Sequence, residues 1–233
     1  MREIVLDTET TGLNPRGGDR IVEIGCVELL NSIPSGQIFH CYLNPDRDMP
    51  EPAFAVHGLS AEFLKDKPRF SDVVEDFLNF VADAPLVIHN AAFDLGFINA
   101  ELDRIAKNPV GSERLVDTLL LARRKHPGGS NRLDDLCVRY GIDATRRTKH
   151  GALLDAELLA EVYVELTGAR QARLGLLENV NRSGPRIQIQ TARTRTDPLP
   201  ILLTPSEDEA HRAFIRTLGE KIIWDDFAAI GEV

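Results

Sequence analysis

The sequence predicts an α/β domain in which helices flank a mixed sheet, followed by a flexible linker and a short C-terminal docking segment. Three β-rich runs near the N-terminus precede alternating helical and β-rich patterns, an order typical of a mixed sheet covered by helices. The apolar periodicity stops after Gly168, and a helical pattern returns only from Ser206. The 233 residues are 43% hydrophobic and 27% charged, which is an ordinary globular composition.

Five segments have the β-branched and apolar composition of strands, namely residues 2–7, 20–29, 37–43, 85–89 and 114–117. Pro34-Ser35-Gly36 is predicted to form the turn between the second and third strands, and residues 45–52 to form a loop. Helical periodicity covers five further segments, residues 71–81, 91–106, 118–125, 132–140 and 151–167. Asn90 precedes the second of these helices and is expected to cap it.

Composition and charge exclude several classes of protein. No run approaches the roughly 18 consecutive apolar residues that a membrane span needs. Two acids near the N-terminus precede any apolar run of signal-peptide length. Cys26, Cys41 and Cys137 lack metal-binding spacing and fit free thiols in a cytoplasmic protein. The formal net charge of −9 does not exclude nucleic acid, because carboxylates that hold divalent cations count as negative only in the sequence.

The sequence offers four candidate acids, and the first three come from two segments that are far apart in the chain. Asp7 and Glu9 stand two residues apart at a strand end, so both side chains leave the same face of the sheet. Adjacent anions repel each other and are costly to bury unpaired, although they can also be solvated acids of a turn. Asp94 lies in the first turn of the 91–106 helix, where an acid can also serve only the helix dipole.

Asp155, the fourth acid, lies on the apolar stripe of the 151–167 helix and needs a cation partner there. His150 stands just before this helix, although a single histidine there is also typical of a loop or a cap. Four carboxylates and one histidine from separate segments can meet at the edge of the sheet. Such a set suits two Mg²⁺ or Mn²⁺ ions, with a neutral histidine taking a proton from an attacking water.

Three motifs resemble, in order, those of the DEDDh 3′–5′ exonuclease family. They are Asp7-Thr8-Glu9-Thr10-Thr11-Gly12, His89-Asn90-Ala91-Ala92-Phe93-Asp94 and His150-Gly151-Ala152-Leu153-Leu154-Asp155. Within this family the chain is most similar to the epsilon-type proofreading subunits of bacterial DNA polymerase III. The resemblance covers residues 1–168 and implies an RNase H-like fold with a five-stranded mixed sheet.

The resemblance implies a metal-dependent 3′–5′ exodeoxyribonuclease that proofreads for a replicative polymerase. Its substrates would be DNA 3′ ends, single-stranded or frayed, and its products 5′-mononucleotides. The implied ligands of two divalent cations, Mg²⁺ or Mn²⁺, are Asp7, Glu9, Asp94 and Asp155. The implied general base is His150. The implied contacts to the terminal nucleotide are Thr10, Leu13 and His57, with Asn90 as a supporting residue.

Residues 169–198 are predicted to be a flexible linker. Residues 169–196 contain six arginines and a single acid, Glu178, and form either a solvated tether or a contact for nucleic acid or an acidic partner. Residues 171–176 resemble the peptide with which replication proteins bind the sliding clamp. The expected clamp contacts are Gln171, Leu174 and Leu176. Alternatively, this hexamer continues the preceding helix.

Residues 199–233 are predicted to bind the polymerase. A short helical segment cannot bury its own large apolar side chains, so these need a groove on a partner. The segment resembles the part of epsilon subunits that binds the alpha subunit, and the expected contacts are Phe214, Leu218 and Trp224. Alternatively, it folds back onto the nuclease. The resemblance also leaves room for a small accessory subunit on the nuclease surface.

Other functions fit parts of the sequence. A DEDDh exonuclease that trims RNA would share the nuclease motifs, but it would need no docking segment. A catalytically silent scaffold between polymerase and clamp is opposed by the intact set of four acids and one histidine. A structural calcium site is disfavoured because the sequence has no loop of EF-hand type.

Overall fold

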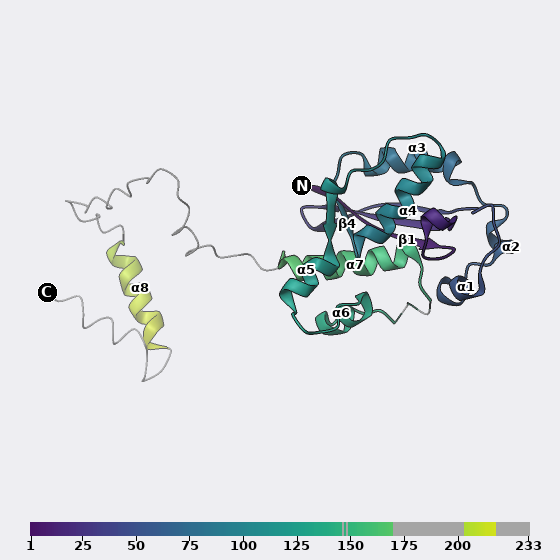
Figure 1. The fold of residues 1–233 in the computed structure, drawn as a ribbon. Coiled ribbons are helices and arrows are strands. Elements are labelled where there is room, and N and C mark those ends of the chain that lie inside the picture. Colours follow the sequence, from purple (N-terminus) through teal and green to yellow (C-terminus); the bar gives the residue numbers. More distant parts are fainter. Residues whose placement is uncertain (146, 148, 170–202, 218–233) are drawn as a thin grey trace, which may run out of the picture. The chain divides into compact units, whose positions relative to one another are not determined.

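The computed structural model describes residues 1–145, 147, 149–169 and 203–217 (Figure 1). The chain divides into two units, residues 1–174 and 175–233, and each is described by itself. The first unit contains a sheet with helices on both faces, and the described part of the second contains one helix. Among the described residues, no helix has the length and apolar character needed to cross a membrane.

Five strands form one mixed sheet in the spatial order β3-β2-β1-β4-β5. They are β1 (Arg2–Thr10), β2 (Ile21–Leu30), β3 (Ile33–Tyr42), β4 (Leu86–Ile88) and β5 (Leu115–Asp117). The first three strands pair antiparallel, whereas β4 pairs parallel with both β1 and β5. The predicted mixed five-stranded sheet is confirmed, and β1 lies at its centre.

Seven α-helices flank the sheet in the described part of the first unit. They are α1 (Glu51–His57), α2 (Ala61–Leu64), α3 (Phe70–Val81), α4 (Ala91–Arg104), α5 (Thr118–Lys125), α6 (Leu133–Tyr140) and α7 (Ala152–Thr167). Helices α3 and α4 cover one face of the sheet, and α7 covers the other (Figure 1). Helices α5 and α6 pack against α7.

The side chains of β1 alternate between the two faces of the sheet. Leu6 lies in the core formed with α3 and α4, whereas Val5 lies in the core formed with α7. The two-residue period of a strand therefore directs Thr8 toward α4 and directs Asp7 and Glu9 toward the face covered by α7. This alternation places the first two candidate acids on one face, as the sequence predicts.

Two local predictions are wrong. The turn between β2 and β3 is Asn31-Ser32, at which both residues have positive φ, and Pro34-Ser35-Gly36 lies within β3 instead. Proline is tolerated there because β3 is an edge strand of this sheet. The loop predicted over residues 45–52 ends early because α1 begins at Glu51, with a proline in its first turn, where a missing N–H is harmless.

Asn90 precedes α4 as predicted, but its side chain does not cap the helix. Its backbone is left-handed, with φ at 64°, whereas a capping side chain needs an extended backbone to reach the first turn. The Oδ2 atom of Asp117 instead accepts a hydrogen bond from the backbone N–H of Ala91 at 3.2 Å. Asn90 is therefore free to line the cavity described below.

The described part of the second unit is helix α8 (Pro205–Arg216). Its N-terminus has a capping box, in which the Thr204 hydroxyl accepts from the backbone N–H of Glu207 and the Glu207 carboxylate accepts from the backbone N–H of Thr204. None of its residues is buried, and Phe214 is 61% exposed. The helical pattern predicted from Ser206 is therefore confirmed as far as the structure describes it.

Candidate active site

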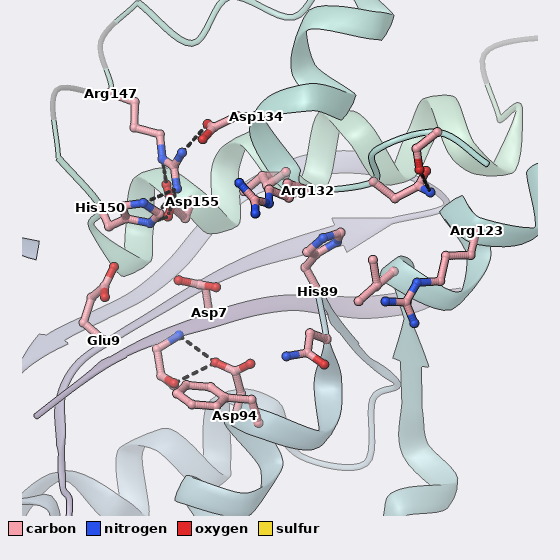
Figure 2. A pocket seen from close by; sticks show the side chains of 17 residues that line it. Asp7, Glu9, His89, Asp94, Arg123, Arg132, Asp134, Arg147, His150 and Asp155 are labelled. Atoms are coloured by element: carbon pink, nitrogen blue, oxygen red, sulfur yellow. Dashed lines mark hydrogen bonds and ion pairs between the residues drawn. The ribbon is translucent and has the colours of Figure 1, made fainter. Parts of the chain in front are cut away.

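A cavity of about 760 Å³ opens where β1 meets the N-terminal turns of α4 and α7 (Figure 2). It is lined by all five residues predicted for catalysis, Asp7, Glu9, Asp94, His150 and Asp155. Four of these residues come from β1, α4 and α7, and His150 comes from the loop just before α7. Residues that are far apart in the sequence are thus brought together, in agreement with the expectation that the separate motifs form one site.

Asp94 is tied to β1 by two hydrogen bonds. Its Oδ1 atom accepts from the backbone N–H of Thr8 at 3.0 Å and from the Thr8 hydroxyl at 2.7 Å (Figure 2). Asp94 is only 3% exposed, so its position in the first turn of α4 serves the cavity as well as the helix dipole. Thr8 therefore aligns the acid of α4 with the two acids of β1.

The N-terminus of α7 lies directly against β2, which brings Asp155 close to Asp7. Gly25 of β2 is opposite Asp7 in the antiparallel pair. A Cβ atom at Gly25 would lie 2.3 Å from the backbone of Ala152, so a larger residue would push α7 away from the sheet. Glycine is required here by this close approach of two backbones.

Asp155 has two cationic or polar partners. The Nε atom of Arg147 lies 2.5 Å from Asp155 Oδ1, and Arg147 Nη2 lies 2.7 Å from Oδ2. His150 Nδ1 is 3.2 Å from Oδ2, and Arg147 also contacts Asp134. Burial raises the pKa of Asp155, but hydrogen bonds from His150 and Arg147 outweigh it and leave the pKa below its ordinary value.

Arg147 is one of the site residues that the sequence analysis did not identify. A core-facing Asp155 predicts a cation partner, yet Arg147 stands eight residues earlier in a segment without helical periodicity. Arg147 contacts His150 as well as Asp155, because its Nη2 atom lies 2.7 Å from Nδ1 of His150. The guanidinium thus joins the predicted base to one of the predicted metal ligands (Figure 2).

Burial and mutual repulsion raise the pKa of the other three acids. Burial raises the pKa of Asp7 well above its ordinary value, and the nearby carboxylates of Asp94, Glu9 and Asp155 add to the rise. Burial followed by repulsion from Asp155 raises the pKa of Glu9 to about 8. Burial raises the pKa of Asp94 to about 7, although hydrogen bonds from Thr8 oppose this change.

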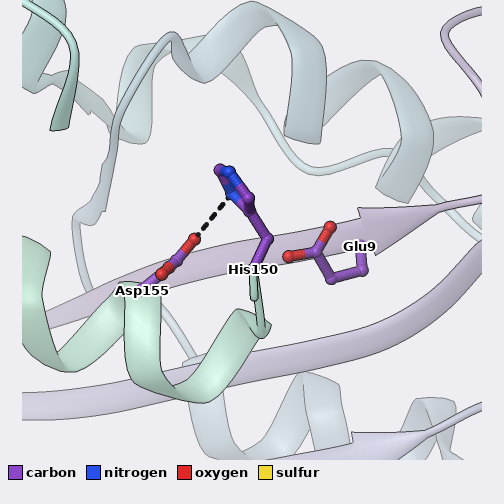
Figure 3. A group of neighbouring side chains, drawn as sticks. All are labelled: Glu9, His150 and Asp155. Atoms are coloured by element: carbon purple, nitrogen blue, oxygen red, sulfur yellow. Dashed lines mark ion pairs between the residues drawn. The ribbon is translucent and has the colours of Figure 1, made fainter. Parts of the chain in front are cut away.

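The donor set fits divalent cations. Glu9, His150 and Asp155 each offer a ligand atom within 4.8 Å of the others (Figure 3), and Asp7 and Asp94 line the same cavity. Carboxylate oxygens are the preferred ligands of Mg²⁺ and Mn²⁺. Arg147 supplies one positive charge for four carboxylates, so further positive charge is needed before all of them can ionise.

These pKa values predict that the metal-free protein loses stability as the pH rises. A carboxyl group whose pKa is higher in the folded state binds its proton more tightly when folded, so stability falls as that proton is lost. For Glu9 the fall extends from its ordinary pKa of 4.5 to about 8. We expect the Tm of protein in EDTA to fall across this range, and Mg²⁺ to restore it most at the alkaline end. Thermal denaturation measures both effects, and a Tm that neither pH nor Mg²⁺ changes would contradict this prediction.

A second cavity of about 560 Å³ adjoins the first and shares Thr8, Glu9 and Phe93 with it. It is lined by three of the residues predicted to contact a terminal nucleotide, Thr10, Leu13 and His57. The fourth, Asn90, lines the first cavity. The sequence analysis did not identify Phe93, which lies at the junction of the two cavities.

His57 presents an unused polar atom in this second cavity. Its Nδ1 atom accepts from the backbone N–H of Leu59 at 3.0 Å, so the neutral ring carries its proton on Nε2. Nε2 is buried and has no hydrogen-bond partner among the described residues. A bound molecule with an acceptor oxygen would satisfy it.

The residues predicted to bind a clamp, Gln171, Leu174 and Leu176, lie outside the described residues. The same is true of Leu218 and Trp224, two of the three residues predicted to bind a polymerase. The third, Phe214, lies on α8 with its side chain exposed. Helix α7 ends at Thr167, before the hexamer 171–176, and Gly168 follows in a left-handed conformation.

Comparisons with known proteins agree on one family. The family model RNase_T, described as an exonuclease, matches residues 4–163. DNA polymerase III subunit epsilon of Rickettsia felis is 45% identical over 223 residues, covering 94% of this chain and 97% of that protein. The same subunit of Escherichia coli is 41% identical over 239 residues, covering 96% and 97%.

Solved structures have the same fold. Exonuclease X in complex with 5′ overhanging duplex DNA matches with a TM-score of 0.56 and 26% identity, covering 71% of this chain and 90% of that chain. The nuclease domain of 3′hExo, a DEDDh family member bound to rAMP, matches with a TM-score of 0.63 and 16% identity, covering 72% and 92%. At 16% identity, the match to 3′hExo shows a similar fold and nothing more.

Proposed function

We propose a mechanism, a substrate site and partners for this chain, which belongs to the exonuclease family and, within it, to the epsilon subunits of DNA polymerase III. It is a 3′–5′ proofreading exonuclease of a bacterial replicative DNA polymerase. The observation that supports the proposed mechanism best is the gathering of four carboxylates from three separate elements in one cavity. Three of them have raised pKa values, which is the electrostatic mark of a site built for added positive charge.

In this mechanism Asp7, Glu9, Asp94 and Asp155 hold two divalent cations, Mg²⁺ or Mn²⁺. When bound, the cations supply the positive charge that phosphodiester hydrolysis needs at the scissile phosphate. Thr8 keeps Asp94 aligned through its two hydrogen bonds. The reaction breaks the bond between the terminal phosphorus and the 3′ oxygen of the preceding nucleotide, and it releases a 5′-mononucleotide.

His150 is the proposed general base. Its side chain is 47% exposed, so a water molecule can reach the ring. Arg147 Nη2, which can only donate, lies 2.7 Å from His150 Nδ1, so His150 acts as a base on Nε2 once Arg147 releases this nitrogen. Asp155 Oδ2, 3.2 Å away, then accepts a hydrogen bond from Nδ1, and the Nε2 lone pair is free to take a proton from the attacking water. The buried carboxylate of Asp155 then stabilises the positive imidazolium that forms.

The second cavity is the proposed site of the terminal nucleoside. Thr10, Leu13 and His57 line it, and the unpartnered Nε2–H of His57 can donate to a sugar or base oxygen. Asn90 supports the site from the first cavity. Because the terminal nucleotide must leave its duplex to enter, a mispaired end, which frays at lower cost, is the better substrate.

The proposed organisation assigns residues 1–168 to the nuclease, 169–198 to a flexible linker and 199–233 to a polymerase-binding segment. We propose that the hexamer 171–176 binds the sliding clamp, and that the last segment binds the alpha subunit of DNA polymerase III. The relatives named as polymerase III subunits support this assembly and a location in the cytoplasm. Tethering also compensates for the weak affinity of an acidic domain for DNA backbone.

Phe214 gives a test of the polymerase-binding segment. Phe214→Ser in the full chain should greatly weaken binding to the purified alpha subunit, because an exposed aromatic side chain on α8 then has no apolar surface to bury. Arg216→Ser is the control, since two helical positions place it on the opposite side of α8. Surface plasmon resonance measures binding, and mononucleotide release should stay normal in both variants. If Phe214→Ser and the wild-type protein bind the alpha subunit with equal affinity, the proposal that this segment binds the polymerase through Phe214 is contradicted.

The function itself is tested with three labelled strands. A DNA primer with a 3′ mismatch should release mononucleotides faster than a matched primer, and both should require Mg²⁺ or Mn²⁺. A matched RNA strand should be degraded more slowly than DNA, which separates a proofreading enzyme from an RNA-trimming relative. Absence of nucleotide release from every strand would favour a silent scaffold instead.

A further inference from the structure

Two arginines face the carboxylate cluster from the other side of the first cavity. Arg123 lies in the last turn of α5, and Arg132 lies just before α6. Both line the cavity, and both side chains are exposed to it. Figure 2 shows them on the side of the cavity away from Glu9, with His89 between them.

Neither guanidinium is used by the fold. Within the part of the chain that the structure describes, the Arg123 and Arg132 side chains make no ion pair or hydrogen bond. By contrast, Arg20 pairs with Glu101, and Arg147 pairs with Asp155. Two uncommitted positive charges on a domain rich in acids are therefore available to a ligand.

The two cavities define the direction of the DNA strand. The proposed terminal nucleoside site is the second cavity, which joins the first at Thr8, Glu9 and Phe93. The scissile phosphate then lies at the carboxylates, and the rest of the strand must leave through the first cavity. Arg123 and Arg132 line that cavity on the side away from Glu9, where this strand would pass (Figure 2).

We propose that Arg123 and Arg132 bind the phosphates of the nucleotides on the 5′ side of the scissile bond. This proposal rests on the proposed exonuclease function and adds two positioning residues to it. A guanidinium matches the geometry of phosphate oxygens and provides charge-assisted hydrogen bonds without reading the base sequence. These two contacts let an otherwise acidic domain hold a strand of any sequence in the correct direction.

The chain offers a matched control for this proposal. Arg124 is the next residue of α5 and is also exposed, but it lines a different cavity. The same change of charge can therefore be made at three positions of the full-length protein, by Arg123→Gln, Arg132→Gln and Arg124→Gln. Each variant is assayed with a single-stranded thymidine oligonucleotide and with the p-nitrophenyl ester of thymidine 5′-monophosphate. The ester has the scissile phosphate and the terminal nucleoside, but no phosphate on the 5′ side of the bond.

Arg123→Gln and Arg132→Gln should each raise KM for the oligonucleotide by about tenfold, the effect of losing one charge-assisted hydrogen bond. Hydrolysis of the ester should be unchanged, and Arg124→Gln should resemble wild type with both substrates. The slope of log KM against log salt concentration should fall by about 0.7 for each arginine removed. KM should change equally for oligonucleotides of different sequence.

Two results would overturn the proposal. The first is that the KM of Arg123→Gln and Arg132→Gln for the oligonucleotide equals the KM of Arg124→Gln. The second is an equal loss with the ester and the oligonucleotide, which would show that the arginines act on the fold or on the chemistry. Failure of the wild-type protein to hydrolyse either substrate would instead refute the exonuclease mechanism itself, so the two failures are distinguishable.

Discussion

Asp7→Asn should abolish hydrolysis and at the same time stabilise the metal-free protein. Asp7 lies at the centre of the cluster, where the charges of Asp94, Glu9 and Asp155 all act on it. Removal of one central ligand costs several kcal/mol of transition-state stabilisation, and about 4 kcal/mol corresponds to about a thousandfold in kcat. The same change removes a buried carboxyl group whose pKa is raised by folding, so the free energy of unfolding in EDTA at pH 8 should rise by about 1 kcal/mol or more.

Glu3→Gln is the matched control for this variant. Glu3 lies on the same face of β1, four residues before Asp7, and it is buried with its carboxylate accepting from the Tyr163 hydroxyl. Its substitution should leave hydrolysis intact and should not stabilise the metal-free fold. Steady-state hydrolysis and urea denaturation measure the two effects. Normal turnover by Asp7→Asn would refute its assignment as a metal ligand.

His150→Gln should lose about 10²- to 10⁴-fold in kcat, which is the usual contribution of a general base. The glutamine can still reach Asp155 and Arg147 by hydrogen bonds, but it cannot accept a proton at neutral pH. Because the carboxylates remain, Mn²⁺ binding should persist. The loss should therefore be confined to the rate of hydrolysis.

His126→Gln provides the comparison for His150→Gln. His126 lies outside both cavities, where its Nε2 atom contacts the Tyr140 hydroxyl at 2.7 Å. Its replacement should leave the hydrolysis rate unchanged. Single-turnover hydrolysis together with calorimetric titration of Mn²⁺ separates the chemical step from metal binding. An unchanged rate in His150→Gln would remove this residue as the base.

The sequence predicts the part of the site that depends on local periodicity. The two-residue period of a strand directs Asp7 and Glu9 to one face, and the structure shows them there. The apolar stripe of the 151–167 segment predicts that Asp155 faces inward, and this residue is 3% exposed. The mixed sheet follows from the order of strand and helix patterns.

Other features depend on contacts between distant segments, which periodicity does not encode. Arg147 reaches Asp155 through the conformation of a loop. Asn90 has a left-handed backbone, and Asp117 from the neighbouring strand makes the helix cap in its place. The turn at Asn31-Ser32 is favoured because Pro34 can remain in an edge strand. In each case tertiary context decides between two locally acceptable conformations.

The number of Mn²⁺ ions bound per chain tests the proposed metal site most directly. Calorimetric titration at pH 8 with thymidine 5′-monophosphate present should find two ions for the wild-type protein, as a two-metal site requires. Asp7→Asn should bind fewer ions, whereas Glu3→Gln should bind as many as wild type. Wild-type protein that binds no Mn²⁺, or an Asp7→Asn variant that binds as many ions as wild type, would contradict the proposal that these carboxylates form a cation site.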